Sequence, residues 1–137
     1  MPRILGVDLG SVRIGLALSD PSGVIAQGLE VVDVTSTPPV DAVVARVKEH
    51  EVDEIVVGIP TRMDGSVGPE AENAEAFARA LEKATGLPVT RWDERLSTKE
   101  AVRSMRAAGA DSRKQRGVID KIAAALFLQA YLESRRS

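Results

Sequence analysis

Apolar runs separated by polar breaks predict five β-strands along this chain. Ile4–Leu9 is an apolar run that Gly10 ends, and Arg13–Ser19 alternates until it meets the turn residues 20–23, Asp-Pro-Ser-Gly. Further strands are predicted over residues 24–34, 54–59 and 89–92. The first three strands follow one another closely, so we expect them to form an antiparallel meander.

Helical spacing, with apolar residues three or four apart, predicts helices over residues 39–50, 70–85 and 118–133. Ser97 followed by Glu100 is a capping box, which predicts one more helix beginning there. Residues 107–117 interrupt the helical pattern and crowd charges together, so we expect this stretch to be the most mobile.

Strands and helices alternate in the second half of the chain, which implies right-handed crossovers and parallel pairing. The fold class is therefore α/β, with a five-stranded mixed sheet, three antiparallel strands and then parallel ones, flanked by helices. A chain of 137 residues fits a single domain over residues 1–137.

The charge and composition exclude several classes of protein. The net charge is −2, so any nucleic-acid binding must come from local patches. The chain has no cysteine, which rules out disulfides and thiolate metal sites. Neither a signal peptide nor a membrane-spanning run is apparent, and we expect a soluble cytoplasmic protein that does not contact a membrane.

Asp8 is the first candidate site residue, because it lies inside an otherwise apolar strand. An ionised carboxylate there needs compensation, since burying it alone would cost several kcal/mol. It either binds a cation or is tied to backbone amides of the next turn. Gly10 and Ser11 would let a ligand approach the backbone closely, which favours the first interpretation.

Asp93 and Glu94 follow the fifth predicted strand, and the carboxyl ends of parallel strands collect at one sheet edge. Adjacent strand residues face opposite sides, so only one of the two can share a site with Asp8. We predict that Glu94 is that residue, with Asp93 as the alternate. The other acid could pair with Arg91 or Arg95.

Asp120 is one turn into the last predicted helix, where Ala123 and Ala124 would let the helix approach the sheet. An acid in the first turn of a helix also favours the helix dipole, which would explain Asp120 without a site. Together with Asp8 and Glu94 it would form a hard-cation site for Mg²⁺ or Mn²⁺. Two such ions about 4 Å apart can activate a water and stabilise the leaving oxygen of a phosphodiester.

Basic residues gather between positions 103 and 121, near the third acid. They could neutralise backbone phosphates, although a solvated helix face is the alternative. The members of this group are Arg103, Arg106, Arg113, Lys114, Arg116 and Lys121. The single histidine, His50, makes a histidine-based catalytic triad implausible.

Four segments together resemble the bacterial pre-16S rRNA nuclease family, also described as Holliday-junction resolvases. They are Gly6-Val7-Asp8-Leu9-Gly10-Ser11 with Gly15, Val57-Gly58-Ile59-Pro60 with Met63-Asp64-Gly65, Asp93-Glu94-Arg95-Leu96-Ser97-Thr98, and Asp120 with Ala123-Ala124. They occur in the family's order through nearly the whole chain. The Asp-Glu-Arg-Leu-Ser-Thr run is the most specific of them.

The resemblance implies a ribonuclease H-like core, magnesium-dependent phosphodiester hydrolysis and maturation of the 5′ end of 16S rRNA. It assigns catalysis and metal binding to Asp8, Glu94 (or Asp93) and Asp120. Contacts to a structured RNA substrate would come from Ser11, Arg62, Asp64, Arg95, Arg113, Lys114 and Arg116. Related resolvases carry an acid on the fourth strand, where this chain has Ile55-Val56-Val57-Gly58-Ile59-Pro60, so the missing carboxylate would have to come from the fifth strand.

Other functions remain to be weighed against this one. A resolvase of four-way, branched DNA would share the fold but would need a two-fold homodimer. An actin-like kinase would need a second domain for which 137 residues leave no room. A binding protein without catalysis would not need three convergent acids.

Overall fold

The computed structural model describes residues 2–10, 12–60, 68–93 and 113–136, with side chains from 121 to 135 in the last of these ranges. Five strands form one sheet in the order β3-β2-β1-β4-β5. The strands are β1 (Ile4–Leu9), β2 (Arg13–Ser19), β3 (Ala26–Asp33), β4 (Glu54–Ile59) and β5 (Val89–Asp93). β1, β2 and β3 pair antiparallel, whereas β1, β4 and β5 pair parallel, which confirms the predicted mixed sheet.

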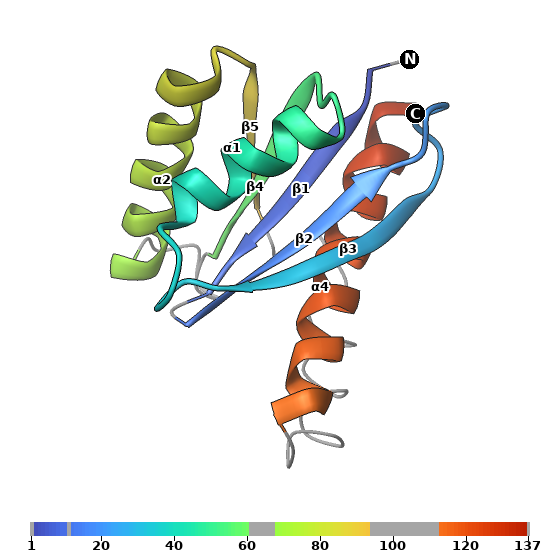
Figure 1. The fold of residues 1–137 in the computed structure, drawn as a ribbon. Coiled ribbons are helices and arrows are strands. Elements are labelled where there is room, and N and C mark those ends of the chain that lie inside the picture. The colour runs from blue at the N-terminus through green and yellow to red at the C-terminus, as the bar shows by residue number, and fades with distance from the viewer. Residues whose placement is uncertain (1, 11, 61–67, 94–112, 137) are drawn as a thin grey trace.

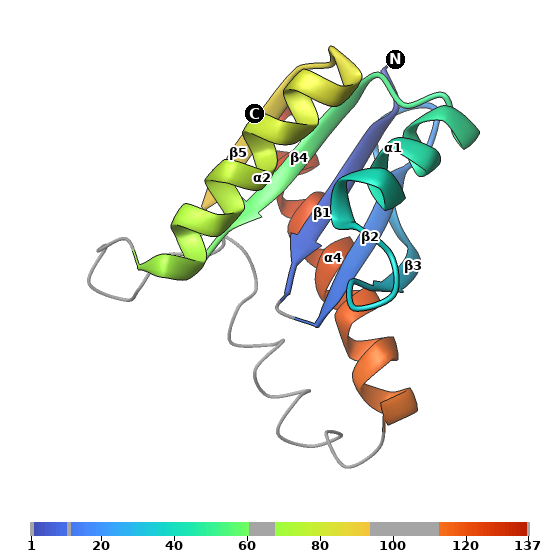
Figure 2. The same ribbon diagram turned by 60° about the vertical axis from the view of Figure 1, so that its left-hand side comes forward.

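Helices cover both faces of this sheet. α1 (Pro39–Glu49) and α2 (Pro69–Thr85) lie on one face, and α4 (Arg113–Arg136) lies on the other (Figures 1 and 2). α2 begins with Pro69 at its first turn and ends at Gly86, which adopts a left-handed conformation (φ 71°) that suits glycine at a helix end. No helix in the described part of the chain is long and apolar enough to cross a membrane.

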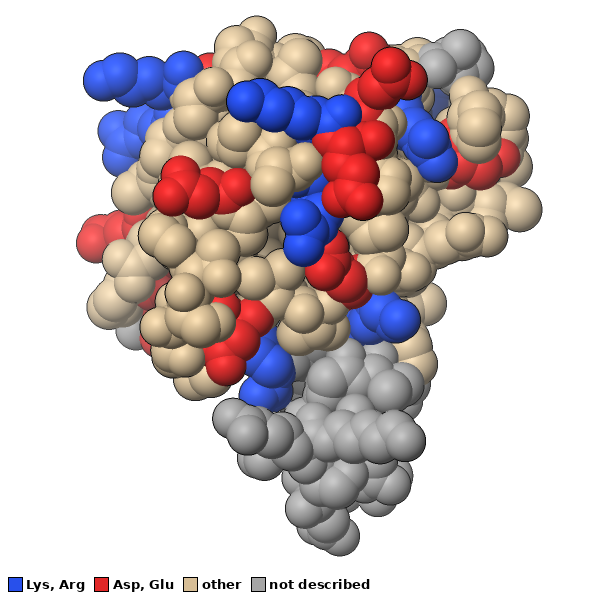
Figure 3. Space-filling view, viewed as in Figure 1, with Lys and Arg blue, Asp and Glu red and all other residues tan. Residues whose placement is uncertain are grey.

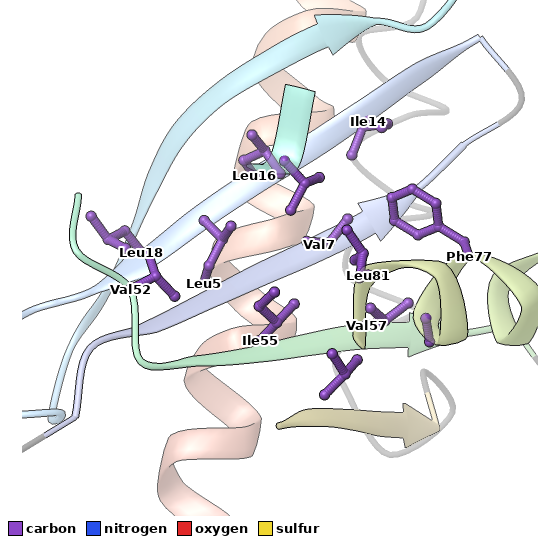
Figure 4. Packing of buried hydrophobic residues seen from close by; sticks show 13 residues of the cluster. Leu5, Val7, Ile14, Leu16, Leu18, Val52, Ile55, Val57, Phe77 and Leu81 are labelled. Atoms are coloured by element: carbon purple, nitrogen blue, oxygen red, sulfur yellow. The ribbon is translucent and has the colours of Figure 1, made fainter. Parts of the chain in front are cut away.

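Two apolar clusters, one on each face, hold the layers together. The larger fills the space between the sheet and α1 and α2, and Figure 4 shows Leu5, Val7, Ile55 and Val57 pointing into it from adjacent strands. The smaller lies between the sheet and α4. Its buried members are Ile4, Ala17, Val56, Ala124, Phe127, Leu128, Tyr131 and Leu132.

The carboxyl-terminal half of α4 is anchored to the sheet by Tyr131. Its hydroxyl donates to Glu54 Oε2 at 2.6 Å, and its ring meets Trp92 edge-on with centroids 5.5 Å apart. Burial raises the pKa of Tyr131, and the carboxylate of Glu54 raises it further. Arg135 adds an ion pair to Glu54 at 3.1 Å. These contacts fix the end of α4 over β4 and β5.

Ion pairs on the opposite face join the helices to the outer strands. Arg91 on β5 contacts Glu75 at 3.1 Å and Glu82 at 2.8 Å, both on α2, and these two carboxylates raise the pKa of Arg91. Arg46 on α1 pairs with Glu30 on β3. Figure 3 shows acidic and basic side chains intermingled over this face.

Predicted boundaries were off by one residue in several elements and by more in two of them. The third strand begins at Ala26 rather than 24, because the Asp20 carboxylate accepts the N–H groups of Val24 and Ile25 and holds them in a turn. The last helix spans Arg113–Arg136 rather than 118–133, since polar end turns continue the helix without apolar periodicity. Residues 113–117, predicted to be mobile, are therefore helical, whereas 107–112 and the helix predicted at Ser97 lie outside the described residues.

The turn between β2 and β3 provides a test by pH. Hydrogen bonds from Ser22 and from backbone amides lower the pKa of Asp20 from 3.8 to about 2. A lowered folded-state pKa stabilises the turn above pH 4, and this stabilisation is lost as the pH falls from about 4 to about 2. We expect the ¹³C signal of the Asp20 carboxyl to titrate near pH 2 and Ser22→Ala to move this midpoint upward. A midpoint near 4 in the unmodified protein would contradict the described turn.

Candidate active site at the carboxyl edge of the sheet

The parallel strands bring two of the predicted acids to one edge of the sheet. Val7 of β1 pairs with Val57 of β4, and Ile59 of β4 pairs with Asp93 of β5. Asp8, one residue after Val7, therefore lies at the same edge as Asp93. The topology confirms that the carboxyl ends of β1, β4 and β5 meet where parallel strands usually place their sites.

Asp8 lies on the face of the sheet that α4 covers. Leu5 and Val7 point into the cluster beneath α1 and α2, whereas Ile4 packs in the α4 cluster. Side chains alternate along a strand, so Asp8 shares the side of Ile4. It is half-buried, and no hydrogen bond or ion pair joins its carboxylate to another residue in the part of the chain that the structure describes.

The turn after β1 does not satisfy Asp8 through the amide of Gly10. The Gly10 N–H donates instead to the carbonyl of Arg13 at 2.9 Å. A Cβ at Gly10 would lie 2.5 Å from that same oxygen, so the closeness of the hairpin itself requires glycine here. The alternative interpretation, a carboxylate held by the next turn, thus loses one of its donors, while Ser11 lies outside the described residues.

Glycines flank Asp8 across the sheet. Gly15 of β2 is its direct partner, and Gly58 of β4 follows Val57, the partner of Val7, so it lies on the other side of Asp8. Both glycines are buried. Of these three neighbouring positions, only Asp8 carries a side chain on the α4 face. The positions beside it on β2 and β4 are both glycine, so they place no side chain next to its carboxylate.

Of the two acids at the end of β5, Asp93 lies on the wrong face for a site with Asp8. Trp92 packs in the α4 cluster and against Tyr131, so it shares Asp8's side of the sheet. Asp93, the next residue, faces the side of α1 and α2. The alternate assignment of Asp93 is thereby disfavoured, and Glu94 lies outside the described residues.

α4 approaches the sheet closely over β1. A Cβ at Gly6 would lie 3.1 Å from Leu128 Cβ and 3.3 Å from Phe127 Cζ, so the absence of a side chain at Gly6 allows this contact. Position 120 precedes Ala124 by one turn, on the helical stripe that Leu128 continues towards the sheet. The amino-terminal part of α4 extends beyond the edge where β1 ends (Figure 1).

Most of the other predicted site residues lie outside the described residues or in a part of α4 where only the backbone is described. Glu94, Ser11, Arg62, Asp64 and Arg95 lie outside the described residues, and for Asp120, Arg113, Lys114 and Arg116 only the helical backbone is described. Within the described residues, no group of three acids or histidines forms a metal site. The predicted ligand set of Asp8, Glu94 and Asp120 therefore stays a prediction.

On the α4 side the structure adds one basic residue that the sequence did not single out, Arg13, and it places Lys121, a member of the predicted basic group. Arg13 lies on Asp8's face, because Gly15, two residues later, is the partner of Asp8. The aliphatic part of the Lys121 side chain lies against β3. Its Cγ would be 2.6 Å from a Cβ added at Gly28. The alternation along Arg13–Ser19 could have indicated Arg13, because it puts this side chain on the other face of the sheet from the apolar Ile14, Leu16 and Leu18.

Comparisons with known proteins show the family of this chain. Residues 2–134 match the family described as "RuvX: Holliday junction resolvase". Proteins named "Putative pre-16S rRNA nuclease" are similar over nearly their whole length. The one from Halothermothrix orenii is 48% identical over 132 residues, which cover 95% of this chain and 94% of that protein. The one from Geobacillus kaustophilus is 48% identical over 138 residues, covering 98% and 99%.

Solved structures show the same fold at low sequence identity. T. thermophilus RuvC in complex with a Holliday junction substrate has a TM-score of 0.57 and 17% identity, covering 100% of this chain and 98% of that one. The fowlpox virus resolvase with substrate Holliday junction DNA has a TM-score of 0.56 and 13% identity, covering 98% and 99%. The fold is thus ribonuclease H-like, as the sequence predicted.

Proposed function

Because this chain belongs to the RuvX family of Holliday junction resolvases, we propose that it is a metal-dependent nuclease that processes the 5′ end of precursor 16S rRNA. The observation that carries the proposal is the placement of Asp8. Its half-buried carboxylate stands between two glycines at the carboxyl edge of the sheet. The names of relatives at 48% identity support the choice of substrate. Processing of rRNA would place the protein in the cytoplasm.

The residues present fit a hard divalent cation. Asp8 offers carboxylate oxygens, the donors that Mg²⁺ and Mn²⁺ prefer, and it has no other ionic partner among the described residues. We assign the rest of the ligand set to Glu94 and Asp120. When bound, the metal supplies charge stabilisation at the phosphate and activation of the attacking water.

The chain itself would hold the substrate at this edge. Asp8 belongs to a strand that pairs on both sides, so its backbone is held rigidly at this edge. We assign phosphate contacts to the basic first turn of α4, which contains Arg113, Lys114 and Arg116, and to Ser11, Arg62 and Arg95, and we assign Asp64 to a loop on the substrate side. These contacts would orient one strand over the three acids.

Removing the metal tests this proposal directly. A labelled RNA spanning the 5′ end of precursor 16S rRNA is incubated with the full chain in Mg²⁺, in EDTA, and in EDTA followed by excess Mn²⁺. We expect cutting in Mg²⁺, a loss of at least about 1,000-fold in EDTA, and recovery with Mn²⁺, because the metal contributes several kcal/mol to the barrier. Cutting that persists in EDTA would contradict a metal-dependent enzyme.

A second substrate, four-way DNA, is favoured by the family description and by the two junction complexes with the same fold. Symmetric cleavage of a junction would require a two-fold homodimer. The same assay with junction DNA, together with the molar mass of the protein in solution, separates the two substrates. A dimer that cuts junctions and leaves the RNA intact would replace rRNA processing with junction resolution, and a protein that cuts neither would refute both.

A further inference from the structure

Arg13 begins β2 at the same edge of the sheet as Asp8 and on the same face. Asp8 pairs with Gly15 and Leu9 pairs with Ile14, so Arg13 is two residues from the partner of Asp8. Adjacent strands lie about 4.8 Å apart and two residues span about 6.7 Å, which places the two Cα atoms about 8 Å apart. An arginine side chain at this distance can reach a group that is bound at Asp8.

The backbone around Arg13 is fixed by contacts outside the regular ladder. Gly10 N–H donates to the Arg13 carbonyl at 2.9 Å, and Val34 N–H donates to the Val12 carbonyl at 2.9 Å. Arg13 also pairs with Asp33 of β3 in the sheet register. The hairpin end is therefore held to both neighbouring strands, and a rigid element of this kind positions a binding side chain accurately.

The guanidinium group has the chemistry for a phosphate. It is always charged and presents a planar fork of donors that matches two phosphate oxygens. Arg13 is half-buried, so part of its side chain is packed while part remains accessible. On the opposite face, Arg46 pairs with Glu30, and Arg91 pairs with Glu75 and Glu82.

We propose that Arg13 is a substrate-positioning residue that binds a backbone phosphate of the nucleic acid strand next to the phosphate at Asp8. This inference rests on the proposed function, because it takes a nucleic acid as the ligand of this edge. Asp33 lies at the paired position on β3, and its Oδ1 accepts hydrogen bonds from Thr35. Sequence would be read elsewhere, since a phosphate contact sets register and not base preference.

The test measures binding without cleavage. Affinity of the full chain for the labelled precursor rRNA fragment is measured in EDTA over a range of salt concentrations, for the unmodified protein, Arg13→Gln and Arg13→Lys. The matched control is Arg79→Gln, which removes an equal charge from an exposed position of α2 on the other face. Thermal unfolding of each variant shows whether it is folded under the assay conditions.

We expect Arg13→Gln to weaken binding about tenfold and to reduce the slope of log affinity against log salt by about 1, as the loss of one phosphate contact requires. Arg13→Lys should keep the slope and bind several-fold more weakly than arginine, because lysine lacks the fork. Arg79→Gln should change neither. A merely structural Arg13 would lower the unfolding temperature and leave the salt slope unchanged.

Two results would overturn the inference. One is an Arg13→Gln variant with the affinity and salt slope of Arg79→Gln. The other, which applies if Arg13→Gln does not fold, is an Arg13→Lys variant that binds as tightly as the unmodified protein. A protein that binds the RNA but cuts neither substrate refutes the proposed function and still tests Arg13, whereas a protein that binds neither RNA nor junction DNA overturns both.

Discussion

Replacing Asp8 with asparagine is expected to lower metal-dependent cleavage by at least about 1,000-fold while leaving the fold intact. Asparagine has nearly the same shape but lacks the negative charge that a hard cation requires. A loss of about 4 kcal/mol in stabilisation of the transition state corresponds to this factor. The rate is measured on the precursor rRNA fragment with saturating Mg²⁺, and Asp41→Asn, on an exposed turn of α1, is the matched control.

Stability gives a second measurement that does not depend on cleavage. Asp8 has no ionic partner among the described residues, so removing its charge should leave the unfolding temperature in EDTA unchanged or slightly higher. Added Mg²⁺ or Mn²⁺ should raise the unfolding temperature of the unmodified protein and of Asp41→Asn, but much less that of Asp8→Asn, because only the native site binds the ion. Equal metal-induced shifts in all three proteins would remove Asp8 from the ligand set.

The second large effect is expected at Gly6, where α4 packs on β1. A single added Cβ would already lie 3.1 Å from Leu128 Cβ, and Leu128 is fully buried. The branched side chain in Gly6→Val must therefore push α4 from the sheet, at a cost of about 2–3 kcal/mol in the free energy of unfolding. Urea unfolding measures this cost.

Gly6→Val should also slow cleavage in the molecules that remain folded. The shift would move position 120 on α4 relative to Asp8 on β1, and a displacement of about 1 Å in a site can cost about 100-fold in rate. Gly6→Ala is the graded companion, since its single Cβ meets buried Leu128 and Phe127 without the branched methyl groups of valine. A Gly6→Val protein as stable and active as the original would show that α4 is not seated on Gly6.

Much of the fold could be predicted because it is encoded locally. β1, β2 and β4 span the predicted residues, since each is a short apolar or alternating run that a glycine, a proline or a turn sequence ends. Errors occurred where a polar group overrides the pattern. The Asp20 carboxylate delays the start of β3, and the polar ends of α4 continue a helix whose apolar periodicity has stopped.

The candidate site could be predicted only in part. Asp8 was recognisable because a carboxylate in an apolar strand is costly without compensation. The choice between Asp93 and Glu94 depended on which side of β5 faces α4. Trp92 packs against Tyr131, which is 39 residues further along the chain, and this contact puts Asp93 on the other side of the sheet from Asp8, while Glu94 stays a prediction. Nothing local to residues 92–94 contains that information.

The sequence by itself determined which segments become strands and helices and which acids are out of place in them. Only the tertiary structure decided which residues share a surface. Alternation along a strand separates its two faces but does not say which helix covers which face, and β1 pairs with β4 across about 50 residues of chain. Gly58 becomes a neighbour of Asp8 only through that pairing, and Gly15 and Arg13 come close to Asp8 through the pairing of β1 with β2, because a cross-strand neighbour is set by register between strands.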